Sequence, residues 1–111
     1  MQMTTESLNN GATRVSLEGQ LDITGFQAID SSFNELASRA DGMVVDMSGV
    51  DFLASIGIRT LVMAAKSQNQ RNQKLIILSP HETVEKVLRT AGIDQLIPIC
   101  ESEQEAIEKL G

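Results

Sequence analysis

Short, almost wholly apolar runs alternate along the chain with longer segments whose apolar residues recur every three or four positions. The runs 43–47 and 74–78 predict buried strands, and residues 97–100 predict a short final strand. Before them, two strands that flank a turn at residues 9–11 predict an edge hairpin, with 13–18 as its second strand. Helical spacing covers four further segments, at 24–40, from 55 to a polar run at 68–73, 80–91 and 102–110. We expect the polar run to be solvated.

The predicted order of elements is β-β-α-β-α-β-α-β-α within a single domain of residues 1–111. Strands and helices that alternate with short connections predict an α/β fold with right-handed crossovers. The sheet should be mixed but mainly parallel, with four to five strands, about four helices and an antiparallel first strand. Because parallel strands end at one edge, Asp22, the turn 51–55 and residues 79–81 should share that edge.

The beginning of the second helix differs from the other helix starts. Thr24, Ser79 and Ser102 each precede a Gln or Glu by three residues, which is the capping-box pattern. Ser55 does not, because Ile58 occupies the corresponding position. Gly57 also leaves the backbone open to close approach there. The pattern predicts an accessible hydroxyl at a helix start, where free N–H groups and the helix dipole can hold an anion.

Composition narrows the classes of partner. The 111 residues are 41% hydrophobic, which suits one domain with its own core. The formal net charge of −6, without a Lys/Arg cluster, Trp or Tyr, argues against nucleic acid and anionic membranes as partners. Cys100 is the only cysteine and lies in an apolar run, which predicts a buried free thiol and a reducing compartment. With no leader pattern or apolar span, we expect the cytoplasm.

Patterns typical of enzymes are missing. The sequence contains no G-x-S-x-G elbow, phosphate-binding loop, dinucleotide fingerprint or zinc-type cysteine pair, so we predict no catalytic residue, cofactor or metal. His81 is the only histidine. A small hydrolase using Ser55 and His81 is the remaining enzymatic alternative.

Several other residues have two interpretations. By position alone, Ser55 is more often an ordinary N-cap than a functional hydroxyl. Ile56 and Met63 lie opposite the predicted buried face of their helix and form either an exposed docking strip or a second packed face. Asp22 is either a turn residue or a contact near Ser55. Asp46 and Asp51 are expected to be structural.

Two stretches resemble one known family. Residues 17–22 read LEGQLD, similar to the L-x-G-x-L/I-D turn of the STAS domain family. Residues 44–58 read VVDMSGVDFLASIGI, similar to that family's V-x-D-(L/M)-S-x-V-x-F-x-D-S-(S/A/T)-G stretch. Two positions depart from the pattern, since Ala54 replaces Asp and Ile56 replaces a small residue. The resemblance covers essentially the whole chain and identifies it as similar to bacterial anti-sigma factor antagonists.

The resemblance implies a phosphorylation switch. In such antagonists the first Ser of D-S-x-G is phosphorylated by an anti-sigma factor serine kinase, and a PP2C-type phosphatase reverses the mark. That Ser corresponds to Ser55, which favours a phosphoacceptor over an N-cap. The unmodified protein would bind the kinase and free a sigma factor. The alternative is an unphosphorylated scaffold or accessory subunit of a stress-signalling or transport complex. The expected partner-binding residues are Asp22, Ser55, Ile56, Gly57, Arg59, Thr60 and Met63.

Overall fold

The predicted order of strands and helices is confirmed in the computed structural model, which describes residues 1–110. A short 3-10 helix, Ile93–Gln95, is the one additional element in these residues. The elements are β1 (Gln2–Ser7), β2 (Thr13–Leu21), α1 (Ile23–Arg39), β3 (Met43–Leu53), α2 (Ser55–Gln70), β4 (Leu75–Leu78), α3 (Glu82–Thr90), β5 (Ile99–Cys100) and α4 (Glu103–Leu110).

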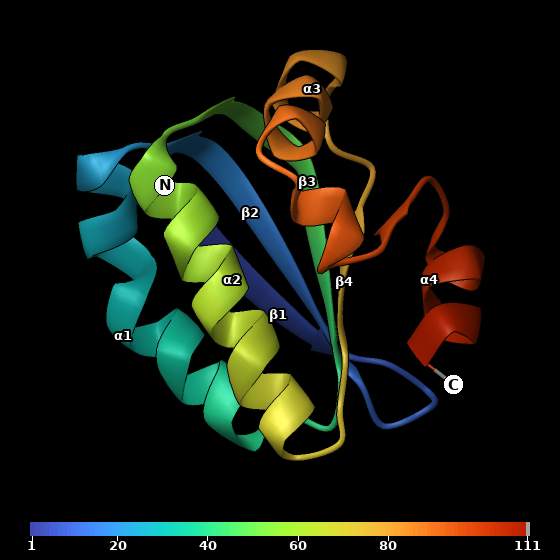
Figure 1. Cartoon of the computed structure of the whole chain (residues 1–111). Helices are drawn as coiled ribbons and strands as arrows, with labels where there is room; N and C mark the ends of the chain where they lie inside the picture. The colour runs from blue at the N-terminus through green and yellow to red at the C-terminus, as the bar shows by residue number, and fades with distance from the viewer. Residues whose placement is uncertain (111) are drawn as a thin grey trace.

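The strands form one mixed sheet in the order β1-β2-β3-β4-β5. β1 pairs with β2 in the antiparallel sense, and the remaining pairs are parallel, as predicted. Figure 1 shows α1 and α2 lying alongside each other in front of the sheet. Because β2, β3 and β4 are parallel, the connections to α1, α2 and α3 all leave the same edge of the sheet.

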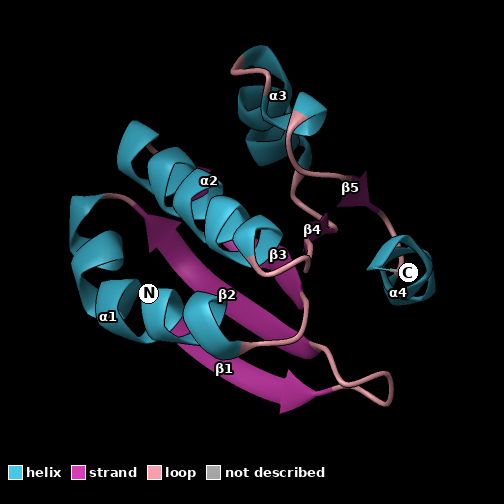
Figure 2. Ribbon diagram, turned by 60° about the horizontal axis from the view of Figure 1, so that its bottom comes forward, coloured by secondary structure: helices cyan, strands magenta, loops and turns pink. Residues whose placement is uncertain are grey.

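The helices form unequal layers on the two faces. Buried residues of α1, α2 and α3, such as Phe33, Leu61 and Leu88, join the main core. A smaller cluster on the other face unites Ala106 of α4 with Ile76 of β4 and other residues. Figure 2 shows α4 next to β4 and β5, away from α1 and α2. Across the same face, Glu103 of α4 reaches Arg14 of β2.

β3 is longer than the predicted strand because two irregularities extend it. Its inward residues alternate normally up to Met47, and then Val50 and Leu53 follow at intervals of three. The pairing with β2 shifts register at the same two places. Gly49 lies at the first shift, where a Cβ atom would come within 3.0 Å of the Leu17 carbonyl oxygen. These bulges carry β3 to Leu53, opposite Leu21 at the end of β2.

Two of the three predicted capping boxes are wrong. α1 begins at Ile23 with Asp22 as N-cap, because the Asp22 carboxylate accepts a hydrogen bond from the Gly25 N–H at 2.8 Å. α3 begins after His81, while the Ser79 hydroxyl donates to the Glu101 carbonyl oxygen at 2.7 Å. At the third, the hydroxyl cap is confirmed, since Ser102 accepts from the Glu105 N–H at 3.2 Å.

The polar run 68–73 is not wholly solvated, because Gln68 is completely buried. Its side-chain amide donates to the carbonyl oxygens of Ala37 and Ala40 at 2.7 and 3.0 Å. Its oxygen accepts from the Gly42 N–H at 3.0 Å. Gln68 therefore satisfies the carbonyl groups at the end of α1 from the last part of α2.

Candidate functional site

The site lies where β2 and β3 end and two helices begin. Leu21 pairs with Leu53, and the Ala54 N–H donates to the Leu21 carbonyl oxygen at 3.1 Å. The next residues are the N-caps of the two helices, Asp22 for α1 and Ala54 for α2. The pairing of the strand ends therefore brings Asp22 and Ser55, which are far apart in the sequence, to one edge of the sheet (Figure 1).

Ser55 is the first helical residue of α2, so its interpretation as the N-cap is wrong. The N-cap is Ala54, which has no side chain to cap the helix. Ser55 is exposed, and among residues 1–110 its hydroxyl takes part in none of the side-chain hydrogen bonds. The first backbone hydrogen bonds of α2 run from the N–H groups of Gly57 and Ile58 to the Ala54 carbonyl oxygen. The N–H groups of Ser55 and Ile56 come earlier in the chain and have no acceptor within the helix. An accessible hydroxyl thus stands beside free helix N–H groups.

Two of the predicted partner-binding residues are buried. A Cβ atom on Gly57 would lie 2.6 Å from Leu21 Cγ and 2.7 Å from Leu53 Cδ1. The glycine therefore allows α2 to approach the strand ends, and the expectation that it opens the backbone to an outside group is wrong. Thr60 is also buried, and its hydroxyl donates to the Ile56 carbonyl oxygen at 2.9 Å.

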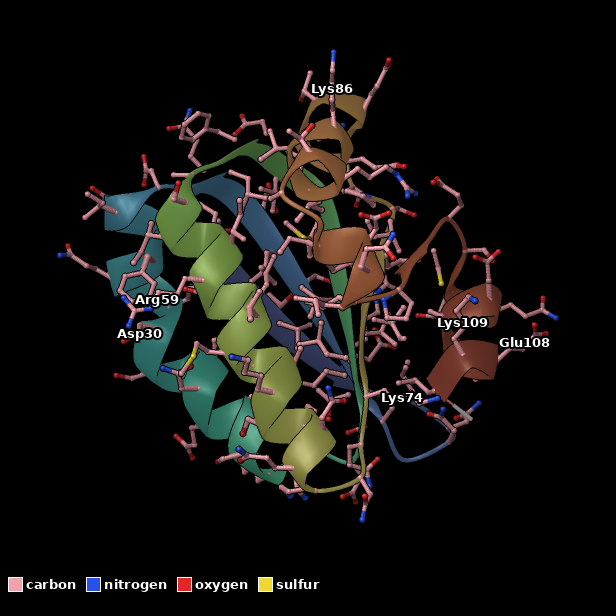
Figure 3. All side chains as sticks on the ribbon, viewed as in Figure 1. Asp30, Arg59, Lys74, Lys86, Glu108 and Lys109 are labelled. Atoms are coloured by element: carbon pink, nitrogen blue, oxygen red, sulfur yellow. The ribbon has the colours of Figure 1, made fainter. Side chains whose placement is uncertain are left out.

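Ile56, Arg59 and Met63, together with Thr60, line an open groove between α1 and α2. Ile56 is half-buried and Met63 is 53% exposed, so the strip is not a second fully packed face of α2. The groove has a volume of about 510 Å³ and receives Arg59 from α2 and Asp30 from α1. Figure 3 shows these two labelled side chains close together on the same side of the molecule.

Sequence reasoning missed two exposed apolar residues at this edge. Ile23, directly after the Asp22 cap, is 66% exposed, and Phe52 in β3 is 50% exposed. A regular alternation in β3 does not predict that Val50 and Leu53 face the core while Phe52 faces outward. The exposure of Ile23 on α1 was missed because the predicted cap at Thr24 placed Ile23 before the start of the helix.

Asp46 is structural, as predicted. Its carboxylate forms an ion pair with Arg14 and accepts a hydrogen bond from the Ser48 N–H at 2.9 Å. Arg14 also forms an ion pair with Glu103 at 2.9 Å. Burial would raise the pKa of Asp46, but the hydrogen bonds from Ser48 and Arg14 outweigh it and leave the pKa below its ordinary value. Asp51 is exposed and has no hydrogen bond to the turn before Ser55 among residues 1–110.

The structure gives little support for a Ser55–His81 hydrolase, a reactive thiol or a metal site. Ser55 and His81 share no hydrogen bond in the described part of the chain, and β4 leaves the sheet level with Asp46 while β3 continues to Leu53. The Cys100 thiol is fully buried, and burial, followed by Glu105, raises its pKa to about 11. Residues 1–110 hold no cluster of three potential metal ligands. None of their helices is long and apolar enough to cross a bilayer.

Comparison with known proteins agrees with the motif and the fold. The anti-sigma-F factor antagonist RsfB of Mycobacterium tuberculosis is 22% identical over 100 residues, which cover 89% of this chain and 81% of RsfB. The crystal structure of an anti-sigma factor antagonist from Mycobacterium paratuberculosis has a TM-score of 0.87 at 19% identity, covering 98% of this chain and 92% of that one.

A third similar protein has been solved in two states. The anti-sigma factor antagonist SpoIIAA in its unphosphorylated form has a TM-score of 0.80 at 19% identity, covering 97% of this chain and 95% of that one. The phosphorylated form of SpoIIAA, a Bacillus cell fate determinant, has a TM-score of 0.74 at 18% identity, covering 99% and 100%. The model of the STAS domain matches residues 5–106. The chain therefore belongs to the STAS domain family.

Proposed function

We propose that this protein is an anti-sigma factor antagonist controlled by phosphorylation of Ser55. Unmodified, it binds an anti-sigma factor serine kinase in the cytoplasm through the edge containing Asp22 and Ser55, and so frees a sigma factor. The observation that carries the proposal is the exposed, unbonded Ser55 hydroxyl at the family's D-S-x-G position. The kinase and a PP2C-type phosphatase supply the chemistry, so the protein itself is not an enzyme.

The position of Ser55 allows the fold to accept a phosphate. Phosphorylation adds about −1.5 to −2 charges and three acceptor oxygens. At the first residue of α2, these oxygens lie beside the free N–H groups and the positive end of the helix dipole. The domain remains folded, while a partner surface that fits the neutral hydroxyl meets a dianion. The similarity of this chain to both states of SpoIIAA supports this view.

Arg59 lies one turn after Ser55 on α2 and is exposed. Within residues 1–110 it takes part in no ion pair. A phosphate on Ser55 can therefore draw on this guanidinium as well as on the helix N–H groups. The replacement of the usual acidic residue by Ala54 removes a charge that would repel the phosphate.

The proposal is tested with the anti-sigma factor serine kinases of the same genome. We expect calorimetric titration to show that Ser55→Ala binds its kinase like the wild type. Incubation with the kinase and ATP should leave Ser55→Ala unphosphorylated. Ser55→Asp should bind at least about tenfold more weakly, because it places a negative charge in the interface. Thr83→Asp adds the same charge at an exposed position of α3 and should leave binding unchanged. Equal affinity of the Ser55→Ala and Ser55→Asp proteins would refute the switch.

A further inference from the structure

The groove between α1 and α2 has the shape of a site for a third helix. It extends along α2 from Ile56 to Ser67, roughly 16 Å or three helical turns. Apolar side chains from both helices line it, namely Phe26, Ala37, Ile56, Met63 and Ala64. Two packed helices with an open apolar seam are the arrangement into which an amphipathic helix can insert its apolar face. The flexible Met63 side chain suits such a contact.

The charges along this groove indicate what the inserted helix should carry. The chain has a net charge of −6, yet α2 contains no acidic residue, and its Arg59 lines the groove. Across the groove, Asp30 accepts a hydrogen bond from the Asn34 side-chain amide at 2.9 Å. By contrast, four other arginines of the described chain form ion pairs, at positions 14, 39, 71 and 89. Arg59 shares the groove with Asp30 but forms no ion pair within residues 1–110, so its guanidinium can pair with an acidic group from outside.

The groove continues into the edge that contains the phosphorylation site. Ile56, its first lining residue on α2, directly follows Ser55. Beyond it, the same edge exposes Ile23 and Phe52, so apolar surface reaches past the strand ends. A partner that contacts Ser55 can thus extend from this edge into the groove along α2, where it meets Arg59 as well as apolar side chains.

We propose that the α1–α2 groove binds an amphipathic helix of the anti-sigma factor that places an Asp or Glu against Arg59. The inference rests on the function proposed above and adds a second element to the switch. A phosphate on Ser55 stands at the open end of the groove, where it repels the partner's carboxylate and competes with it for Arg59. Phosphorylation then weakens both the contact at Ser55 and the contact along the groove.

Charge reversal and apolar substitution test the groove directly, with affinity for the anti-sigma factor kinase as the readout. Arg59→Glu and Met63→Asp should each weaken binding at least about tenfold. Lys66→Glu is the matched control, because it reverses a charge on an exposed residue of the same helix that does not line the groove. It should bind within about twofold of the wild type. Circular dichroism and thermal unfolding would show that all three variants remain folded.

The outcomes separate the groove from the switch. If Arg59→Glu and Met63→Asp bind like the wild type while Ser55→Asp does not, the groove is overturned and the switch stands. Equal weakening by Lys66→Glu and Arg59→Glu also overturns it, since a diffuse charge effect then explains the data. If the wild type binds no anti-sigma factor kinase, the proposed function fails and the groove proposal fails with it.

Cross-linking identifies the occupant. A benzoylphenylalanine at position 63 should cross-link to a partner peptide with helical apolar spacing and an acidic residue, and the same probe replacing exposed Val87 in α3 should not. Substituting Lys for that acidic residue in the partner should restore binding to Arg59→Glu. A cross-link to a second copy of this chain, to a segment without an acidic residue, or only from position 87 would overturn the proposal.

Discussion

Asp22 and Ser55 begin neighbouring helices, but their side chains serve the backbone differently. The Asp22 carboxylate is engaged by the Gly25 N–H and holds the start of α1. The Ser55 hydroxyl holds nothing in its own helix, and α2 begins without a side-chain cap. A modification of Ser55 therefore disturbs no hydrogen bond on which the fold depends. This separation of stability from function is what a reversible mark requires.

The cap of α1 gives a residue-scale prediction. Asp22→Ala should lower the free energy of unfolding by about 1 kcal/mol, because the Gly25 N–H loses its acceptor. Urea denaturation measures the change. Thr24→Ala is the control, since Thr24 is exposed and begins a false capping box. A larger loss for Thr24→Ala than for Asp22→Ala would contradict the assignment.

Gly57 gives a second prediction, which depends on whether Gly57→Ala stabilises or destabilises the protein. Alanine normally stabilises a helix relative to glycine by about 1 kcal/mol. Here the added methyl group would meet the side chains of Leu21 and Leu53, so Gly57→Ala should instead destabilise the protein by about 1–3 kcal/mol. Chemical denaturation of the variant measures this. A gain in stability would show that α2 is free to move away from the strand ends.

At the scale of elements, α2 is fixed at both ends. Near Ser55, Gly57 packs against the ends of β2 and β3, and at the other end Gln68 forms hydrogen bonds to the end of α1. The groove lies between these two contacts. Its walls are therefore held in place before any partner arrives, which lowers the ordering cost of binding.

The Gln68 junction is tested by removing its side chain. Gln68→Ala should lower the free energy of unfolding by about 2 kcal/mol, because it leaves the Gly42 N–H without its acceptor and removes one donor from the carbonyl groups of Ala37 and Ala40, which Ser67 and Arg71 also contact. Asn69→Ala, at the exposed neighbour, should change it by less than about 0.5 kcal/mol. Similar small effects of both substitutions in denaturation experiments would mean that water replaces the Gln68 side chain readily.

The elements also show where sequence reasoning succeeds and where it stops. Apolar runs and helical spacing predicted β3, β4, β5 and the four α-helices, which each contribute buried residues, and the turn at residues 9–11 predicted the hairpin of β1 and β2. Gln68 could not be predicted to be buried, because its partners on α1 are brought near only by the packing of two helices. The bulges of β3 were equally hidden, as they insert residues that break the alternation from which strands are recognised. Without them, Phe52 could not be assigned to the exposed face.

At the scale of the whole molecule, Arg14 links the two layers. Its guanidinium on β2 contacts Asp46 on β3 and Glu103 on α4, the one helix on the other face of the sheet. The place of Asp46 beside a turn led us to expect a structural role, but Arg14 and its second partner, Glu103, lie 89 residues apart and have no local signal. Long-range ion pairs of this kind are evident only in the folded chain.

This ion pair predicts a pH dependence of stability. The folded pKa of Asp46 lies below its ordinary value of 3.8, so the ionised carboxylate stabilises the folded protein. The stability advantage of the wild type over Asp46→Asn should be complete well above pH 3.8 and should disappear as the pH falls through the lowered pKa. Urea denaturation between pH 7 and pH 2.5 measures it. Asp51→Asn, at an exposed carboxylate, is the control and should be as stable as the wild type throughout this range. If the wild type remained more stable than Asp46→Asn at pH 2.5, the account would be contradicted.

The measurement that tests the central claim most directly is phosphopeptide mapping of the protein purified from its native cells. We predict that the peptide containing Ser55 carries phosphate in a fraction of molecules that changes with growth or stress, and that Ser55→Ala abolishes the signal. Phosphate confined to other residues, or an unmodified Ser55 under every condition, would contradict the switch. The Ser55 edge would then be a permanent docking surface of an unphosphorylated scaffold.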